Sequence, residues 1–280
     1  MNDHELARKL ARETGALLVG LREHAKTFKV DPNRSQSSLT EESAVSDLDN
    51  SLGEVLGNEG DQVAHDYLME QFSLHRPDDV VLSEEGNLDV DRLGASRVWI
   101  IDPLDGTAQY STGGTDFAVH VALWEATSKN PSKISAASVA VSARNELWSM
   151  DEPIQSYLPK GEPIRILVSR SRPPREVASI ASALQEKFPE RGEVQIVPMG
   201  SVGAKVGAIL SGTADVYFNS DGFFEWDLAA PLGIACHNGL SVTDCDGSEI
   251  ELNKINLRVK DILICRPELT ETIVSALKPR

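Results

Sequence analysis

The stretch VWIIDPLDGT, residues 98–107, decides the fold, because it places two carboxylates directly after a short run of large apolar residues. Such a run predicts a buried strand, and Pro103 and Gly106 then predict a turn. Asp102 and Asp105 would lie at the strand end, where two close negative charges need protonation, hydrogen bonds or a bound cation. We expect a divalent metal there. An ordinary Asp-Pro turn with Asp105-Gly106 at its tip is the alternative.

Charge and composition exclude several classes of partner. The 280 residues include 27 Lys and Arg against 43 Asp and Glu, a formal net charge of −16. This charge disfavours nucleic-acid polymers and anionic membranes, although a metal would still allow a small phosphorylated substrate. We expect a cytoplasmic protein, because no apolar leader or membrane-spanning stretch is present. Neither a zinc site nor a disulfide framework is indicated by the three separated cysteines, Cys236, Cys245 and Cys265.

The first 75 or so residues suggest two helices separated by a loop. Leucines at helical spacing predict an amphipathic helix over the first two dozen residues. The segment 31–60 is rich in Ser, Asn, Asp and Gly, so we predict a mobile loop there, either a functional lid or a tolerated insertion. A second helix follows, with Asp61 near its N-terminus, where a carboxylate complements the helix dipole or serves as an N-cap.

Strands dominate the rest of the first half. The apolar run 80–82 ends in Ser83-Glu84-Glu85-Gly86, which repeats the pattern of a strand followed by carboxylates, although an exposed Glu-Glu turn is the alternative. His120 fits a packed strand histidine better than a ligand. The pattern predicts an α+β part over residues 1–158, with a Pro- and Gly-rich boundary at 151–163. We predict the further strands at 117–123, 134–141 and 146–150.

The second half alternates strands and helices, which predicts an α/β part over residues 159–280. We predict strands at 164–168, 194–197, 214–218 and 262–265, and helices at 174–188, 201–210, 226–237 and 267–277.

Two motifs in the second half carry chemistry. The sequence MGSVGAK, residues 199–205, places small residues at a strand-to-helix junction, which leaves backbone N–H groups open to an anion, with Lys205 one turn into the helix. Helix packing explains the small residues equally well. The sequence EWDLAAP, residues 225–231, sets Asp227 at a helix start beside a large aromatic residue, where N-capping is the alternative.

In order along the chain, Asp61, SEE (83–85), DPLDGT (102–107), GSxxxK (200–205) and WDxAA (226–230) resemble the lithium-sensitive, magnesium-dependent phosphatase superfamily that includes inositol monophosphatase. The resemblance spans nearly the whole chain. It implies a layered αβαβα sandwich of the inositol monophosphatase and fructose-1,6-bisphosphatase type, often found as a homodimer. The chain is most similar to the actinobacterial form of the CysQ branch, the 3′(2′),5′-bisphosphate nucleotidases, in segments 97–102, 117–124 and 225–227.

The resemblance also implies the roles of individual residues. Oxygen ligands for two or three Mg²⁺ ions would come from Glu84, Asp102, the Leu104 carbonyl, Asp105 and Asp227. Asp61 would orient the Thr107 hydroxyl, which together with Glu84 would orient the attacking water. The substrate would be bound by Gly106, Thr107, Gly200, Ser201 and Lys205, and by Ser169 and Arg172 within the turn Ser169-Arg170-Ser171-Arg172.

The implied activity is magnesium-dependent removal of the 3′-phosphate from 3′-phosphoadenosine 5′-phosphate (PAP), and from its sulfated form PAPS, in sulfate assimilation. One alternative is the same chemistry on inositol 1-phosphate, fructose 1,6-bisphosphate or another sugar phosphate. A non-catalytic, metal-dependent binding protein is the other. The chain departs from the CysQ pattern in the length of segment 31–60 and, with consequences for sugar preference, at Ala108, Gln109 and Tyr110, where relatives carry a basic residue, Glu and Phe.

Overall fold

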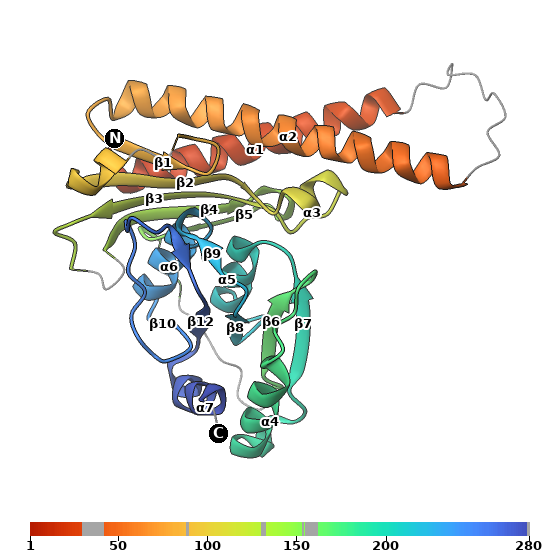
Figure 1. The fold of residues 1–280 in the computed structure, drawn as a ribbon, viewed down its shortest axis with the longest axis vertical. Helices are drawn as coiled ribbons and strands as arrows, with labels where there is room; N and C mark the ends of the chain where they lie inside the picture. The colour runs from red at the N-terminus through yellow and green to blue at the C-terminus, as the bar shows by residue number, and fades with distance from the viewer. Residues whose placement is uncertain (30–41, 88–89, 130–132, 153, 155–161, 279–280) are drawn as a thin grey trace.

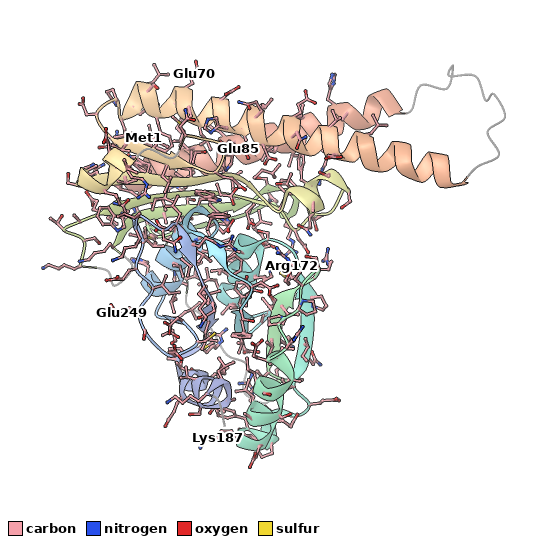
Figure 2. All side chains as sticks on the ribbon, in the orientation of Figure 1. Met1, Glu70, Glu85, Arg172, Lys187 and Glu249 are labelled. Carbon is pink, nitrogen blue, oxygen red and sulfur yellow. The ribbon has the colours of Figure 1, made fainter. Side chains whose placement is uncertain are left out.

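Two mixed sheets and pairs of helices stack alternately in the computed structural model of the chain (Figure 1), and Figure 2 adds the side chains in the same orientation. The structure describes residues 1–29, 42–87, 90–129, 133–152, 154 and 162–278. The expected layered αβαβα sandwich is confirmed. From one outer face to the other the helix layers are α1 (Asp3–Lys29) with α2 (Glu42–His75), α5 (Val202–Leu210) with α6 (Glu225–His237), and α4 (Val177–Lys187) with α7 (Pro267–Leu277).

The first sheet lies between the α1–α2 layer and the α5–α6 layer. Its strands follow the order β1-β2-β3-β4-β5, with β1 parallel to β2 and the other neighbours antiparallel. Both faces of the central strands are apolar, because helices cover each face. The strands are β1 (Val80–Ser83), β2 (Arg97–Asp105), β3 (Ala118–Glu125), β4 (Ile134–Val141) and β5 (Glu146–Ser149).

The second sheet has the order β10-β12-β8-β6-β7, in which β6 runs parallel to both β7 and β8. Its strands are β6 (Arg165–Ser169), β7 (Gln195–Met199), β8 (Val216–Asn219), β10 (Ser241–Thr243) and β12 (Ile262–Cys265). A separate two-stranded ribbon is formed by β9 (Phe223–Phe224) and β11 (Arg258–Val259). The remaining short helices are α3 (Thr107–Ser111) and the 3₁₀ turns Val90–Gly94, Ser142–Arg144 and Pro189–Arg191.

Separate apolar cores lie on the two sides of β2. Trp99 belongs to the outer core, which also includes Leu6 and Leu10 of α1, and all three side chains are fully buried. Ile100 belongs to the inner core, which also includes Leu228 of α6. Successive residues of one strand thus anchor opposite layers, so the sheet that carries the DPLDGT motif is fixed from both sides.

The predicted mobile loop over segment 31–60 is wrong for its second half. Residues 42–60 belong to α2, which runs without interruption to His75, while residues 30–41 lie outside the described part of the chain. The polar and glycine-rich composition suggested a loop. In the structure the glycines lie where α2 packs closely on α3, so they serve a helix interface rather than a turn.

Apart from the start of α2, the other predicted elements are confirmed, with ends that differ by a few residues. β2 continues through the motif to Asp105, with an irregular register between Asp102 and Asp105 where a turn was expected. The proposed domain boundary falls mainly on residues outside the described ranges, so the division into 1–158 and 159–280 stays a prediction. Among the helices that the structure describes, none is long and apolar enough to cross a membrane.

Candidate active site

Two neighbouring strand ends deliver the first carboxylates of the site. β1 runs parallel to β2, with Ser83 opposite Ile101. Because the strands run in the same direction, the residues that follow emerge at the same edge of the sheet, and Glu84 comes beside Asp102. The buried strand residues hold this edge in place.

A third carboxylate comes from the first turn of α6. Oδ2 of Asp227 accepts a hydrogen bond from the Phe224 amide at 2.8 Å, which fixes the side chain at the helix start. One oxygen each of Glu84, Asp102 and Asp227 lies within 4.8 Å of the others. Three carboxylate oxygens at this spacing suit a hard divalent cation.

The electrostatics of these carboxylates call for a positive charge. Burial, together with the charges of Glu84, Asp105 and Asp227, raises the pKa of Asp102 well above its ordinary value. Glu84 is exposed at the pocket, yet the surrounding protein displaces part of its water, and this effect with the charge of Asp227 raises its pKa to about 8. Burial and the charge of Asp105 raise the pKa of Asp227 to about 6. Each raised pKa means that the ionised carboxylate is not stabilised enough by the groups around it.

One oxygen of Asp102 also lacks a group that would compensate its negative charge. Oδ1 accepts a hydrogen bond from the Leu104 amide at 3.0 Å, whereas Oδ2 is buried and has no hydrogen-bond partner among the described residues. Buried carboxylate oxygens are normally paired or coordinate a metal. The residues present therefore fit a metal centre.

Asp105 is bonded differently from the other carboxylates. Its Oδ2 accepts hydrogen bonds from Ser201 Oγ at 2.5 Å, Val202 N at 2.6 Å and Gly203 N at 3.2 Å, at the start of α5. The same oxygen lies 3.3 Å from Nε2 of His120, which is a buried residue of β3, as expected. Burial opposes ionisation of Asp105, but His120 and Ser201 outweigh it and lower its pKa to about 2. Asp105 thus connects the DPLDGT motif to α5.

Asp61 reaches the site from the middle of α2, so the expectation of a helix start at this residue is wrong. Oγ1 of Thr107 lies 3.4 Å from Oδ1 of Asp61 and 3.1 Å from the Leu104 carbonyl oxygen. Burial and the charge of Glu85 raise the pKa of Asp61 to about 7. The structure thus brings the two members of the predicted catalytic pair together.

Two glycines of α2 make this approach geometrically possible. A Cβ at Gly57 would lie 2.5 Å from Ser111 Oγ and 3.0 Å from Thr107 Cγ2, and a Cβ at Gly60 would lie 2.8 Å from Tyr110 Cε1. Tyr110 is fully buried, and its hydroxyl donates to a carbonyl of α1, so it cannot easily move aside. A side chain at Gly60 would therefore push α2 away from α3, whereas at Gly57 the Ser111 hydroxyl would have to turn aside.

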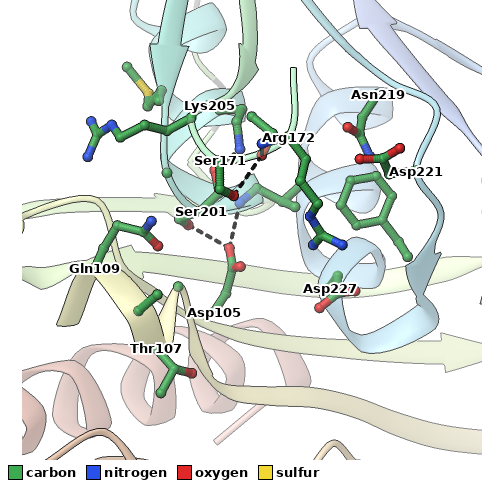
Figure 3. A pocket seen from close by; sticks show the side chains of 18 of the residues that line it. Asp105, Thr107, Gln109, Ser171, Arg172, Ser201, Lys205, Asn219, Asp221 and Asp227 are labelled. Carbon is green, nitrogen blue, oxygen red and sulfur yellow. Dashed lines mark hydrogen bonds between the residues drawn. The ribbon is translucent and has the colours of Figure 1, made fainter. Parts of the chain in front are cut away.

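The carboxylates open onto a pocket of about 520 Å³, which Figure 3 shows from close by. Of the predicted metal ligands, Glu84, Asp105 and Asp227 line it, whereas Asp102 and Leu104 lie in the protein behind its wall. All the predicted substrate-binding residues line it: Gly106, Thr107, Ser169, Arg172, Gly200, Ser201 and Lys205.

Lys205 is buried in the pocket wall. Its Nζ donates to the Ser201 carbonyl at 2.9 Å and lies 4.8 Å from the centre of the Tyr217 ring. Burial lowers the pKa of Lys205 to about 8, although Asp105 opposes this shift. Ser201 has a φ of 48°, which is strained for a residue other than glycine, and its Oγ caps α5 by accepting from the Ala204 amide. The GSxxxK segment is therefore rigidly held beside Asp105.

Sequence reasoning missed several residues of the pocket. The pairing of β9 with β11 brings Arg258 over the ring of Phe224, with its guanidinium carbon 5.1 Å from the ring centre. Two-residue strands carry no periodic signal, so no pattern pointed to this pair. The residues missed are Tyr217, Asn219, Asp221, Gly222, Phe223, Phe224 and Arg258.

Comparison with known proteins agrees with this geometry. Residues 25–279 match the model of the inositol monophosphatase family. The chain is 39% identical over 226 residues to a protein of Mycobacterium bovis named 3′-phosphoadenosine 5′-phosphate phosphatase, which covers 79% of this chain and 82% of that protein. It is 35% identical over 271 residues to a protein of the same name from Mycobacterium leprae, covering 89% of this chain and 97% of that one.

Among solved structures, the chain is similar to CysQ from Bacteroides thetaiotaomicron, with a TM-score of 0.70 and 22% identity, covering 94% of this chain and 97% of that chain. This likeness concerns the fold, whereas the family match covers the site motifs as well. The chain belongs to the inositol monophosphatase family.

Proposed function

We propose that this protein is a magnesium-dependent phosphatase that hydrolyses the 3′-phosphate of PAP, and also of PAPS, to leave the 5′-nucleotide and inorganic phosphate. In sulfate assimilation this reaction would remove a nucleotide by-product. The names of the mycobacterial relatives support the substrate. The observation that carries the proposal is the cluster of Glu84, Asp102 and Asp227 at a pocket that also holds cationic side chains.

The metal ligands in this proposal are Glu84, Asp102, the Leu104 carbonyl, Asp105 and Asp227, holding two or three Mg²⁺ ions. When bound, such ions neutralise the charge on the phosphoryl oxygens and lower the pKa of a water molecule. The raised pKa values of the carboxylates and the unpaired Oδ2 of Asp102 support this ligand set.

The chain's own groups would orient the attacking water. The Thr107 hydroxyl has one hydrogen, which can go either to Asp61 or to the Leu104 carbonyl. With that carbonyl engaged as a ligand, the hydrogen goes to Asp61, and a lone pair of Thr107 Oγ1 accepts from the water. Glu84 would hold the same water from the other side. Orientation of this kind is a large part of catalysis in phosphoryl transfer.

The other pocket residues would bind the substrate. The amides of Gly106 and Thr107 would hold the phosphate that is cleaved. The second phosphate and the nucleoside would lie against a set of residues from the loops of the second sheet: Ser169, Arg172, Gly200, Ser201 and Lys205. The homodimer expected from the resemblance stays a prediction.

Phosphate release from PAP tests this proposal. Release should require Mg²⁺, be inhibited by Li⁺, and be lost in Asp102→Asn, which should cost more activity than replacement of any other single ligand. Asp246→Asn, at an exposed loop position, is the matched control. Retained activity in Asp102→Asn would overturn the mechanism. A protein that binds PAP with Mg²⁺ yet releases phosphate from no candidate substrate would instead be a binding protein.

A further inference from the structure

Asp116 is a buried carboxylate next to the pocket that the mechanism above does not use. It lies just before β3, and its side chain is only 7% exposed. Its carboxylate accepts hydrogen bonds from Arg144, from Nη2 of Arg170 at 2.6 Å and from the Gly200 amide at 3.1 Å. Asp116 is therefore the centre of a buried, charge-assisted hydrogen-bond network, and we call these four residues, Asp116, Arg144, Arg170 and Gly200, the junction.

The junction joins the two sheets at the pocket. Asp116 comes just before β3, and Arg144 ends the 3₁₀ turn between β4 and β5, so both flank strands of the first sheet. Neither is among the residues that line the pocket. Arg170 follows β6, Gly200 follows β7, and both line it. Asp116 therefore fixes Arg170 and Gly200, two residues of the pocket wall, from a position outside the pocket.

Contacts at Gly200 show how closely this corner is packed. A Cβ on Gly200 would lie 2.9 Å from Cβ of Asp116 and 2.7 Å from Cγ of Gln109. Gln109 has a neutral side chain, so it adds no negative charge here. The Asp116 carboxylate supplies the negative charge beside Gly200, and its hydrogen bond from the Gly200 amide fixes the turn there.

The two arginines and one carboxylate of the junction have a net positive charge, and Arg170 presents that charge to the pocket. Arg144 and Arg170 offset the single charge of Asp116, and although burial opposes ionisation, the Gly200 amide and Arg144 hold the pKa of Asp116 below its usual range. The side chain of Arg170 is 52% exposed, and its bond to Asp116 engages one of its five N–H groups. A guanidinium held in this way is preorganised for phosphate.

We propose that Asp116 is a positioning residue that fixes the turn at Gly200 and holds Arg170 in place to bind the second, uncleaved phosphate of a nucleotide bisphosphate. Arg170 then contributes, with the other residues proposed to hold the second phosphate, to the preference for a bisphosphate over a monophosphate substrate. The proposal rests on the function proposed above, because it requires a substrate with two phosphates. It adds a residue outside the pocket whose effect passes through Arg170.

Steady-state kinetics of Asp116→Asn and Arg170→Ala on two substrates test the proposal. One substrate is PAP, and the other is adenosine 3′-monophosphate, which lacks the 5′-phosphate. Loss of a charge-assisted contact should raise KM for PAP by about 10-fold or more in each variant, with kcat unchanged. Both constants for the monophosphate should stay at wild-type values. Because Asp116 acts through Arg170, the double variant should lose no more than Arg170→Ala alone.

Controls separate this role from a structural one. Arg175→Ala removes an exposed arginine of the same loop region and should change neither substrate's constants. Asp116→Glu, which keeps the charge, should recover part of the PAP affinity. Equal losses on both substrates would show that Asp116 only supports the fold. If wild-type enzyme cleaves the monophosphate but not PAP, the proposed function fails as well, whereas normal PAP cleavage in both variants overturns only the role of Asp116.

Discussion

Oδ1 of Asp61 lies 3.4 Å from the Thr107 hydroxyl although 46 residues separate the two along the chain. The pair joins the middle of α2 to the first residue of α3. Asp61 is not part of the three-carboxylate cluster, so the role proposed for the pair is to orient the attacking water rather than to hold the metal.

Replacement of Asp61 should therefore slow the chemical step without weakening substrate binding. We expect Asp61→Asn to lower kcat by roughly 10²–10³-fold, the usual effect of losing a group that orients a proton transfer, with little change in KM. Thr107→Val should behave alike, and the double variant should be no slower than either. Asp66→Asn, an exposed position on the same helix, is the control. Additive losses would contradict a shared role.

The close approach of α2 to α3 should also be needed for full activity. In Gly60→Ala the new Cβ would meet the ring of Tyr110 at 2.8 Å, so α2 must shift and draw Asp61 away from Thr107. We expect kcat to fall by about 10-fold or more, because small misplacements of catalytic groups are costly. A Cβ at Gly20 on α1 would meet no atom within 4 Å, so Gly20→Ala should leave kcat unchanged. Equal activity of the two variants would argue against the packing requirement.

Asp102 and Asp105 should have opposite effects on the stability of the metal-free protein. Asp102 is repelled by its neighbours, so Asp102→Asn should raise Tm in EDTA. Asp105 accepts three hydrogen bonds at the start of α5, so Asp105→Asn should lower the free energy of unfolding by about 1.5–3 kcal/mol. Thermal unfolding in EDTA measures both. Destabilisation by Asp102→Asn would mean that its charge is compensated in the free protein.

The stabilisation produced by Mg²⁺ should grow with pH. In the metal-free fold the pKa values of Asp227 and Glu84 are raised to about 6 and about 8. The folded state therefore binds these protons more tightly than the unfolded chain, whose carboxylates titrate near pH 4, so these groups destabilise the fold increasingly as pH rises from about 4 to about 8. Since Mg²⁺ binds the ionised carboxylates, the rise in Tm on adding it should be larger at about pH 8.5 than at about pH 5.

The same measurement on Glu84→Gln provides the control for this linkage. Removing one titrating ligand should reduce the difference between the two pH values. A rise in Tm that is equal at both pH values in the wild-type protein would contradict the proposal that Mg²⁺ and protons compete for this cluster.

Part of the site could be predicted from the sequence, because Glu84 and Asp102 each come directly after a buried apolar run. The position of Glu84 beside Asp102 follows from two apolar runs that each end in acids, once the strands are parallel neighbours. Helix ends with capping groups, such as Asp227 in α6, were visible for the same local reason.

Tertiary contacts without a local pattern could not be predicted. The first part of α2 was taken for a loop because glycines that serve helix packing have the same composition as glycines in turns. Asp116 bonds Arg170 and Gly200 across separations of 54 and 84 residues, and nothing in the local sequence around Asp116 indicates those partners. Arg258 reaches the pocket through a two-residue strand pairing.

The most direct test of the central claim is kcat/KM for phosphate release from PAP, inositol 1-phosphate and fructose 1,6-bisphosphate, measured with Mg²⁺ on one preparation of the wild-type protein. We predict the highest value for PAP, by about 10-fold or more, as expected for a pocket that makes a charge-assisted contact to the second phosphate of a nucleotide. An equal or higher value for inositol 1-phosphate or fructose 1,6-bisphosphate would contradict the account.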